Sequence, residues 1–300
     1  MPDHRTPRVQ RTWSVRLGLG TAQFGLDYGV ANAGRASRAE TAATLDEAVR
    51  CGFWLLDTAP AYGDAEQRLG ELGAADRLRV VTKTNAAARS ADELARDFAG
   101  SLARLRAAKL YALLEHRPER LLAPDGARRF EALARLRDEG RVEKLGASVY
   151  TRAEVDALLA RFPLDVIQLP LSILDQRLLH DGTLAGLRAR GIEVHARSLL
   201  LQGALTLPAS ALPPHLARLA PALERVDAEA QQRGLARVEL AIAFVASLRE
   251  LDVAIVGAAS RAQLVELAAA AKIALDPGEL AHLASADTAL LDPSRWPARP

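Results

Sequence analysis

The regular alternation of short apolar runs with longer amphipathic ones limits this chain to few folds. Each short run is rich in Val, Ile or Leu and is followed by a Gly, Pro or polar loop, as is typical of buried parallel strands. Eight strands are predicted: Val15–Gly20, Phe53–Asp57, Leu78–Lys83, Leu110–Glu115, Val142–Ser148, Val166–Pro170, Ile192–Arg197 and Val253–Gly257.

Helical patterns lie between most of these strands. Capping boxes begin two of them, at Ser37 with Glu40 and at Thr151 with Glu154. Eight strands that alternate with helices favour a (β/α)8 TIM barrel of the α/β class. We expect a single domain over residues 1–300, with a core at about 15–275 and peripheral tails at 1–14 and 290–300. The predicted helices are Ala39–Cys51, Ala91–Leu105, Ala127–Glu139, Thr151–Arg161, Leu216–Gln232 and Val238–Leu248.

Composition narrows the function classes. Lys and Arg total 39, Asp and Glu total 37, and the Arg residues are scattered, so no nucleic-acid partner is expected. No run reaches the roughly 18 apolar residues that span a bilayer, and Met1–Trp13 lacks the apolar core of a secretory signal. With Cys51 alone no internal disulfide can form, and the six histidines show no metal-ligand spacing. We expect a cytoplasmic protein without metal, as a monomer or weak homo-oligomer.

Polar residues end three successive predicted strands. Asp57 ends the second strand, Tyr62 follows five residues later, Lys83 ends the third strand, and His116 follows the fourth. Active sites of α/β barrels lie at the C-terminal ends of the strands, so these four side chains are expected to meet at the barrel mouth.

The four residue types suit the reduction of a carbonyl. A tyrosine hydroxyl is a weak acid in water, and an adjacent ammonium stabilises its phenolate. On this hypothesis Tyr62 protonates the carbonyl oxygen as a hydride reaches the carbon, Lys83 assists Tyr62, Asp57 holds Lys83, and neutral His116 orients the carbonyl. Taken singly, each residue also has a structural interpretation: a helix cap, a packing tyrosine, a rim lysine and a loop histidine.

These motifs together resemble the aldo-keto reductase superfamily, from about Arg16 to Ala271. The matching segments are Leu17–Gly25, the Asp-Thr-Ala-x-x-Tyr-Gly motif at Asp57–Gly63 with Glu66, Leu69 and Gly70 after it, Val80–Lys83, Leu113–His116, Leu136–Val142 and Leu145–Ser148. The resemblance implies an extended NAD(P)H across the barrel mouth without a Rossmann fold.

The resemblance also implies roles for individual residues. Gly20 and Thr21 would approach the ribose and pyrophosphate, beside Asp57. The nicotinamide carboxamide would bind Ser148 and Gln168. The pyrophosphate would be bordered by Ser198, Leu199, Gln202 and Gly203, and the adenosine end would be formed by Gly257, Ser260, Arg261, Gln263 and Glu266.

Three positions depart from the family pattern. Val149 replaces an Asn beside Ser148, Leu267 replaces an Asn beside Glu266, and Arg197 stands where an aromatic residue often stacks on nicotinamide. The guanidinium plane of Arg197 could lie on the ring instead. Arg261 is the nearest cation for a 2′-phosphate, so NADPH is expected as cofactor, with NADH as the alternative.

The expected substrate is a small carbonyl compound. Phe24 and Tyr28, in the first loop, are predicted to line its pocket together with Tyr62 and His116, and Asp27 and Asn32 would add polar contacts that suit a sugar-like carbonyl. Two other functions stay open: a Schiff-base lyase that uses Lys83 as nucleophile, and a cofactor-binding interaction subunit with slow turnover.

Overall fold

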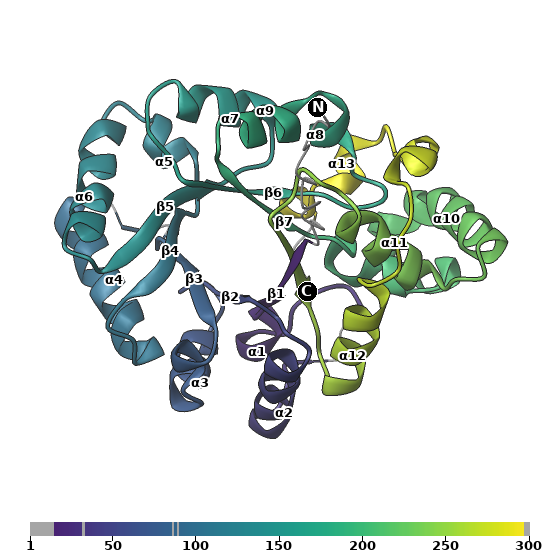
Figure 1. Ribbon diagram of the computed structural model, residues 1–300, viewed down its shortest axis with the longest axis horizontal. Coiled ribbons are helices and arrows are strands. Elements are labelled where there is room, and N and C mark those ends of the chain that lie inside the picture. The colour runs from purple at the N-terminus through teal and green to yellow at the C-terminus, as the bar shows by residue number, and fades with distance from the viewer. Residues whose placement is uncertain (1–14, 32–33, 86, 89, 297–300) are drawn as a thin grey trace, which may run out of the picture.

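The computed structural model describes residues 15–296, apart from 32–33, 86 and 89. Its centre is a closed barrel in which eight parallel strands pair in sequence order (Figure 1). β8 also pairs with β1, where Gly257 lies opposite Gly20. The strands are β1 (Arg16–Gly20), β2 (Leu55–Asp57), β3 (Arg79–Lys83), β4 (Leu110–Glu115), β5 (Val142–Ser148), β6 (Val166–Pro170), β7 (Glu193–Arg197) and β8 (Val253–Gly257). The predicted TIM barrel is confirmed, and β4, β5, β6 and β8 have the predicted bounds.

Helices surround the barrel on its outside (Figure 1). Every predicted helix is present to within two residues at each end, except that the first turn of Leu216–Gln232 is a separate 3-10 segment, Pro214–Leu219. The α-helices are α1 (Ala22–Gly25), α2 (Arg38–Arg50), α3 (Ala65–Glu71), α4 (Ala91–Leu105), α5 (Glu119–Leu122), α6 (Gly126–Asp138), α7 (Arg152–Leu159), α8 (Arg177–His180), α9 (Thr183–Ala189), α10 (Ala220–Gln232), α11 (Arg237–Ala246), α12 (Arg261–Ala270) and α13 (Thr288–Leu291).

Two apolar layers stabilise this arrangement. The larger layer lies between the strands and the surrounding helices and includes Leu45 of α2, Leu69 of α3 and Leu264 of α12. The smaller layer fills the inside of the barrel, with Leu55 and Val166 among its side chains. Because apolar side chains fill the inside, the barrel is a packed core whose polar residues are confined to its two ends.

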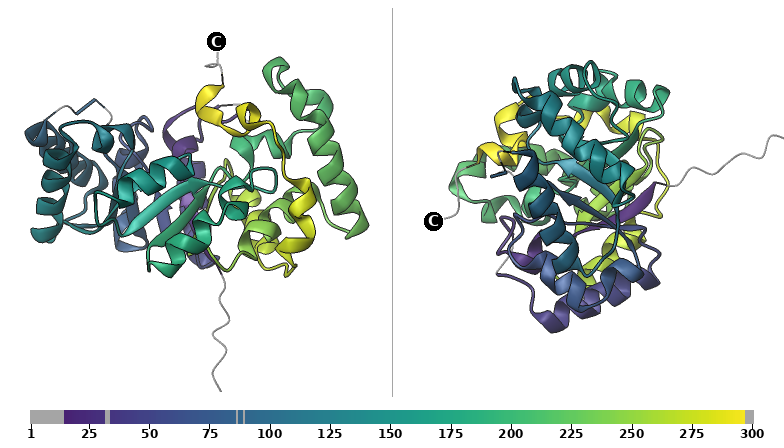
Figure 2. Two further views of the ribbon diagram at one scale, coloured as in Figure 1. Left: turned by 90° about the horizontal axis from the view of Figure 1, so that it is seen from above. Right: turned by 90° about the vertical axis from the view of Figure 1, so that its left-hand side faces the viewer.

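The C-terminal segment differs from the expectation of a peripheral tail from residue 290. Leu290 and Leu291 of α13 are buried, and the backbone N–H of Ser285 donates to the carbonyl of Leu174. Figure 2 (left) shows this yellow segment beside the green helix α10. The segment ends on the side of the barrel that lies away from the start of β1. The expected N-terminal tail, residues 1–14, lies outside the described residues. Within the described ranges, none of the helices combines the length and apolar character needed to cross a bilayer.

Candidate active site

A cavity of about 930 Å³ opens at the C-terminal ends of the strands. Its walls include Gly20 of β1, Asp57 of β2, Lys83 of β3, Gln168 of β6 and Gly257 of β8. Loop residues Tyr62 and His116 also line it, so the four predicted catalytic side chains meet at one cavity, as the strand ends predict.

Lys83 is the centre of this cluster. Its Nζ lies 2.8 and 2.9 Å from the two carboxylate oxygens of Asp57, 3.1 Å from the carbonyl oxygen of Thr58 and 3.2 Å from Tyr62 Oη. Burial by itself would lower the pKa of Lys83, but Asp57 and Tyr62 outweigh it and leave that pKa above its usual value. Lys83 is therefore an ammonium group at neutral pH, with Tyr62 and Asp57 as hydrogen-bond partners.

The loop that carries Tyr62 is held by close backbone contacts. Its turn is closed by hydrogen bonds from Tyr62 N to Ala59 O and from Ala65 N to Tyr62 O. Gly63 has a φ of +57°, and a Cβ there would lie 2.3 Å from the carbonyl oxygen of Gly25. A Cβ at Gly25 would in turn lie 1.8 Å from Tyr62 O. Glycine at both positions lets α1 pack directly on this loop.

His116 faces Tyr62 across the cavity mouth. Their rings are nearly perpendicular, with centroids 6.4 Å apart. Burial, together with the Lys83 ammonium, lowers the pKa of His116 to about 4, so its imidazole is neutral at pH 7. The backbone N–H of His116 donates to Thr84 Oγ1, which donates to Glu115. A buried ion pair with Arg129 holds Glu115 behind the loop.

Gln168 lies in the wall of the cavity and carries a buried acceptor. Its Nε2 donates to Asp57 Oδ1 at 2.7 Å, which fixes the amide, while its buried Oε1 has no hydrogen-bond partner among the described residues. A buried acceptor without a partner is costly, so a ligand that donates there is favoured. Ser148, also in the cavity wall, accepts from Arg197 Nε at 3.3 Å. These two side chains fit a primary amide such as the carboxamide of nicotinamide.

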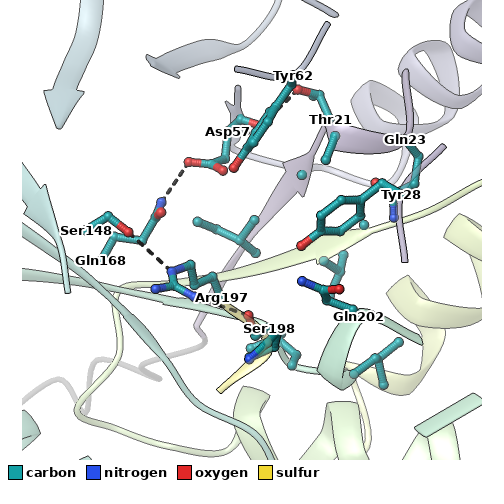
Figure 3. Close-up of a pocket in the computed structure, with 18 of the residues that line it drawn as sticks. Thr21, Gln23, Tyr28, Asp57, Tyr62, Ser148, Gln168, Arg197, Ser198 and Gln202 are labelled. Carbon is teal, nitrogen blue, oxygen red and sulfur yellow. Dashed lines mark hydrogen bonds between the residues drawn. The ribbon is translucent and has the colours of Figure 1, made fainter. Parts of the chain in front are cut away.

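Arg197 is held on several sides (Figure 3). Its guanidinium carbon lies 4.2 Å from the centre of the Tyr150 ring, and its two terminal nitrogens donate to Val149 O and Ser198 Oγ. Val149, which stands in place of the family's Asn, is fully buried and contributes its backbone carbonyl to this contact.

The loop after β7 adopts an unusual backbone where it lines the cavity. Ser198, Leu201 and Gln202 have φ values of +60°, +46° and +52°, and Gly203 follows at +93°. Such conformations cost free energy and persist at ligand sites when the surroundings hold them. Here the N–H of Val30 donates to Gln202 O at 2.8 Å, which joins the first loop to the seventh. Leu199 also lines this part of the cavity.

The predicted adenosine end is only partly at the cavity. Gly20, Thr21, Gly257 and Gln263 line it. Three predicted residues do not: Ser260 caps α12, Arg261 is ion-paired with Glu47, and Glu266 is exposed on the outer part of α12. Leu267 is buried in the core, so the departure from the family pattern at this position affects packing.

The prediction that Phe24 lines the substrate pocket is wrong. Its side chain is fully buried in the core layer between the strands and the helices, and it does not line the cavity. Tyr28 does line the cavity, where burial raises its pKa. Asp27 is exposed and is not part of the cavity wall, and Asn32 lies outside the described residues.

Several cavity residues were not predicted. Tyr150 could have been found, because it follows the end of β5 by two residues. Asp292 could not have been found in this way, because it does not follow a strand. It lies at the mouth because the C-terminal segment folds back to the cavity. The other polar side chains that were missed are Gln23, Arg117, Glu119, Thr151, Glu154 and Thr206.

Comparison with known proteins agrees with this geometry. The model of the Aldo/keto reductase family matches residues 16–288. The chain belongs to this family. The 6-dehydroglucose reductase of Novosphingobium aromaticivorans is 30% identical over 259 residues, which are 78% of this chain and 81% of that protein. The NADH-specific methylglyoxal reductase of Escherichia coli is 31% identical over 216 residues, 64% of this chain and 65% of that protein.

Solved structures of aldo-keto reductases share the fold. One from Klebsiella pneumoniae, in complex with NADPH, is 26% identical with a TM-score of 0.69 and covers 92% of this aldo-keto reductase and 94% of its own chain. Another, from Bacillus halodurans, is 20% identical with a TM-score of 0.73, covers 94% and 93% of the two chains, and supports the barrel fold alone.

Proposed function

We propose that this aldo-keto reductase reduces an aldehyde or ketone to the alcohol, with Tyr62 as general acid and NADPH or NADH as hydride donor. The observation that carries the proposal is the position of the Lys83 ammonium between Tyr62 Oη and the carboxylate of Asp57, at the inner end of an open cavity.

When bound, the dinucleotide supplies the hydride. Gln168 Oε1 and Ser148 would hold its carboxamide, in the wall of the same cavity that Tyr62 lines. The pyrophosphate would lie between Thr21 and the strained loop at Ser198–Gly203, and the adenosine would extend toward Gly257 and Gln263. Both NADPH and NADH are proposed as donors, because the NADPH-bound Klebsiella relative and the NADH-specific Escherichia coli relative are both similar to this chain.

Proton delivery follows from the buried cluster. As the carbonyl carbon receives the hydride, its oxygen takes the proton of Tyr62 Oη, and the product is the alcohol. The Lys83 ammonium stabilises the phenolate left on Tyr62, and Asp57 keeps Lys83 charged and oriented. Neutral His116 donates its ring N–H to the carbonyl oxygen and aligns it with Tyr62. Solvent then reprotonates Tyr62 through the cavity.

The Schiff-base alternative is disfavoured by the same contacts. A nucleophilic lysine must lose its proton, whereas Asp57 and Tyr62 outweigh the effect of burial and raise the pKa of Lys83. The amine is therefore held in the form that cannot attack a carbonyl.

A polyhydroxylated carbonyl suits the polar groups of the cavity wall. Arg117, Glu119, Thr151 and Asp292 are among its lining residues and offer charged and polar side chains. The relative named 6-dehydroglucose reductase supports a sugar-like substrate for this chain as well.

The test has two steps. NADPH and NADH are titrated against the protein by calorimetry, and a panel of aldehydes and ketones, sugar-like and apolar, is then followed by cofactor absorbance. We expect binding and turnover, with the fastest reduction for hydroxylated carbonyls. Tight binding with negligible turnover across the panel would instead support a regulatory subunit, and absence of binding would refute the proposal.

A further inference from the structure

Helices α2 and α12 lie side by side where the barrel closes (Figure 1). α2 follows the first loop and α12 follows β8, so residues more than 200 positions apart meet here. The cavity reaches this junction at Ala259 and Gln263, which flank the first residue of α12. In the proposed binding mode this is the end that receives the adenosine.

Backbone N–H groups at the start of α12 already donate hydrogen bonds to acceptors of this chain. The backbone N–H of Arg261 donates to Glu40 Oε1 of α2 at 2.6 Å. Ser260 accepts the N–H of Gln263 with its hydroxyl at 3.2 Å and that of Leu264 with its carbonyl at 3.1 Å. A free helix N-terminus attracts phosphate through these N–H groups. In this chain a carboxylate stands at the first of them.

The Arg261 side chain is engaged by the same helix. Its Nε donates to Glu47 Oε2 at 2.7 Å, and Glu47 also pairs with Arg50. The hydrogen bond from Arg261 is the main cause that lowers the pKa of Glu47, so this carboxylate is charged at neutral pH. The cation that a 2′-phosphate would need is thus already paired with an anion.

We infer that Glu40 and Glu47 are specificity-determining residues that oppose a 2′-phosphate, so that this chain binds NADH at least as tightly as NADPH. This inference rests on the proposed function, which places the adenosine at the junction of α2 and α12. A phosphate dianion that approaches Arg261 meets two carboxylates and gains little from a cation that is already neutralised. A ribose 2′-hydroxyl carries no charge, and it can donate a hydrogen bond to a carboxylate such as that of Glu40.

The experiment uses ligands that lack nicotinamide, so its outcome does not depend on catalysis. Calorimetry measures the affinity of the wild-type protein for 5′-ADP and 2′,5′-ADP, and then for NADH and NADPH. We expect the wild type to bind 5′-ADP at least as tightly as 2′,5′-ADP. Glu40→Gln and Glu47→Gln each keep an acceptor for Arg261 but remove a charge, and we expect each to tighten 2′,5′-ADP binding about tenfold.

Asp46→Asn is the matched control. Asp46 is an exposed carboxylate of α2 that pairs with Arg77 and makes no contact with Arg261 among the described residues. Its substitution removes the same charge from the same helix, and the ratio of the two affinities is expected to stay within about twofold of wild type. Thermal melting of each apo variant verifies that the fold is retained.

The outcomes separate the inference from the proposed function. If wild type binds 2′,5′-ADP more tightly than 5′-ADP, or if neither Gln variant changes the ratio, the inference is wrong while cofactor binding still supports the proposed function. If neither NADH nor NADPH binds, the proposed function itself fails. An equal change in Asp46→Asn would mean that overall charge, and not the contact with Arg261, sets the ratio, which also overturns the inference.

Discussion

Each end of the barrel carries a connected cluster of charged and polar side chains, and the two clusters differ in whether they line the cavity. The mouth cluster consists of Asp57, Tyr62, Lys83 and Gln168 at the C-terminal ends of the strands. The base cluster consists of Tyr111, Lys144, Glu193 and His195, toward the N-terminal ends.

The base cluster is as well connected as the mouth cluster. Glu193 accepts from Tyr111 Oη at 2.7 Å, lies 2.7 Å from His195 Nε2 and forms an ion pair with Lys144. Burial would raise the pKa of Glu193, but His195 and Lys144 outweigh it and lower that pKa to about 2. By charge, hydrogen bonding and perturbed pKa alone, this cluster is as good a candidate active site as the mouth.

The cavity is what separates them. Every member of the mouth cluster lines it, whereas no member of the base cluster does. Each cluster holds a buried polar atom without a hydrogen-bond partner among the described residues, Gln168 Oε1 at the mouth and His195 Nδ1 at the base, but of these two residues only Gln168 lines the cavity. A buried, connected charge therefore indicates function only where a substrate can reach it.

The sharpest way to break this comparison is Tyr62→Phe. It removes the acid but keeps the ring, so we expect kcat to fall by about 10²–10⁴-fold while cofactor affinity stays nearly unchanged. Stopped-flow turnover and calorimetric binding measure the two effects. Tyr111→Phe is the matched control at the base, and we expect it to leave kcat close to wild type. Wild-type turnover in Tyr62→Phe would refute the role of the mouth cluster.

Glu193→Gln should affect stability instead. It removes the negative charge that pairs with Lys144 and lies beside His195, and we expect a loss of about 3 kcal/mol in the free energy of unfolding. Urea denaturation measures this loss. We expect the variant to keep its kcat when it is assayed at a temperature well below its melting temperature. Glu143→Gln, which removes an exposed carboxylate paired with Lys109, is the control and should change the free energy of unfolding little. A fall in kcat in a folded Glu193→Gln variant would show that the base cluster contributes to catalysis.

The pH dependence of stability distinguishes the base further. The pKa of Glu193 is lowered from 4.5 to about 2, so its contribution is complete above pH 4.5 and is lost as the pH falls toward 2. We expect the urea midpoint of wild type to fall over this interval. The fall should be shallower in Glu193→Gln, and equal slopes in the two proteins would contradict the assigned pKa.

The smallest expected effect is at His116. An ordinary histidine would give an inflection in kcat/KM near pH 6.5, but the pKa of His116 is lowered to about 4. We therefore expect kcat/KM to stay constant between pH 5.5 and 7. We also expect NMR to show that the His116 ring is neutral over this pH range. His116→Asn assigns the ring signal. A titration of that ring near pH 6.5 would show that burial and Lys83 do not keep it neutral.

The fold and most of the mouth cluster could be predicted from the sequence. Alternating apolar runs determine parallel strands, and parallel strands in a closed barrel bring their C-terminal ends together, so Asp57 and Lys83 had to meet. Helix α3 was not predicted because it has only seven residues and contains Gly70, which weakens the helical pattern.

Contacts between loops could not be predicted in the same way. The hydrogen bond from Gln168 to Asp57 joins residues 111 positions apart, and the contact of Glu40 with Arg261 spans 221. Phe24 was assigned to the pocket from its place in the first loop, but the direction of its side chain depends on how the α1 turn packs on the Tyr62 loop.

The sequence by itself determined the barrel, the order of its strands and the chemical types that meet at its mouth. These depend on local periodicity and on strand ends, which are properties of short segments. Only the tertiary structure decided which buried charges face a cavity, which way Phe24 points and which anions neutralise Arg261. Those outcomes depend on side-chain directions and on loops from distant parts of the chain, and they are settled only when the helices and loops pack against one another.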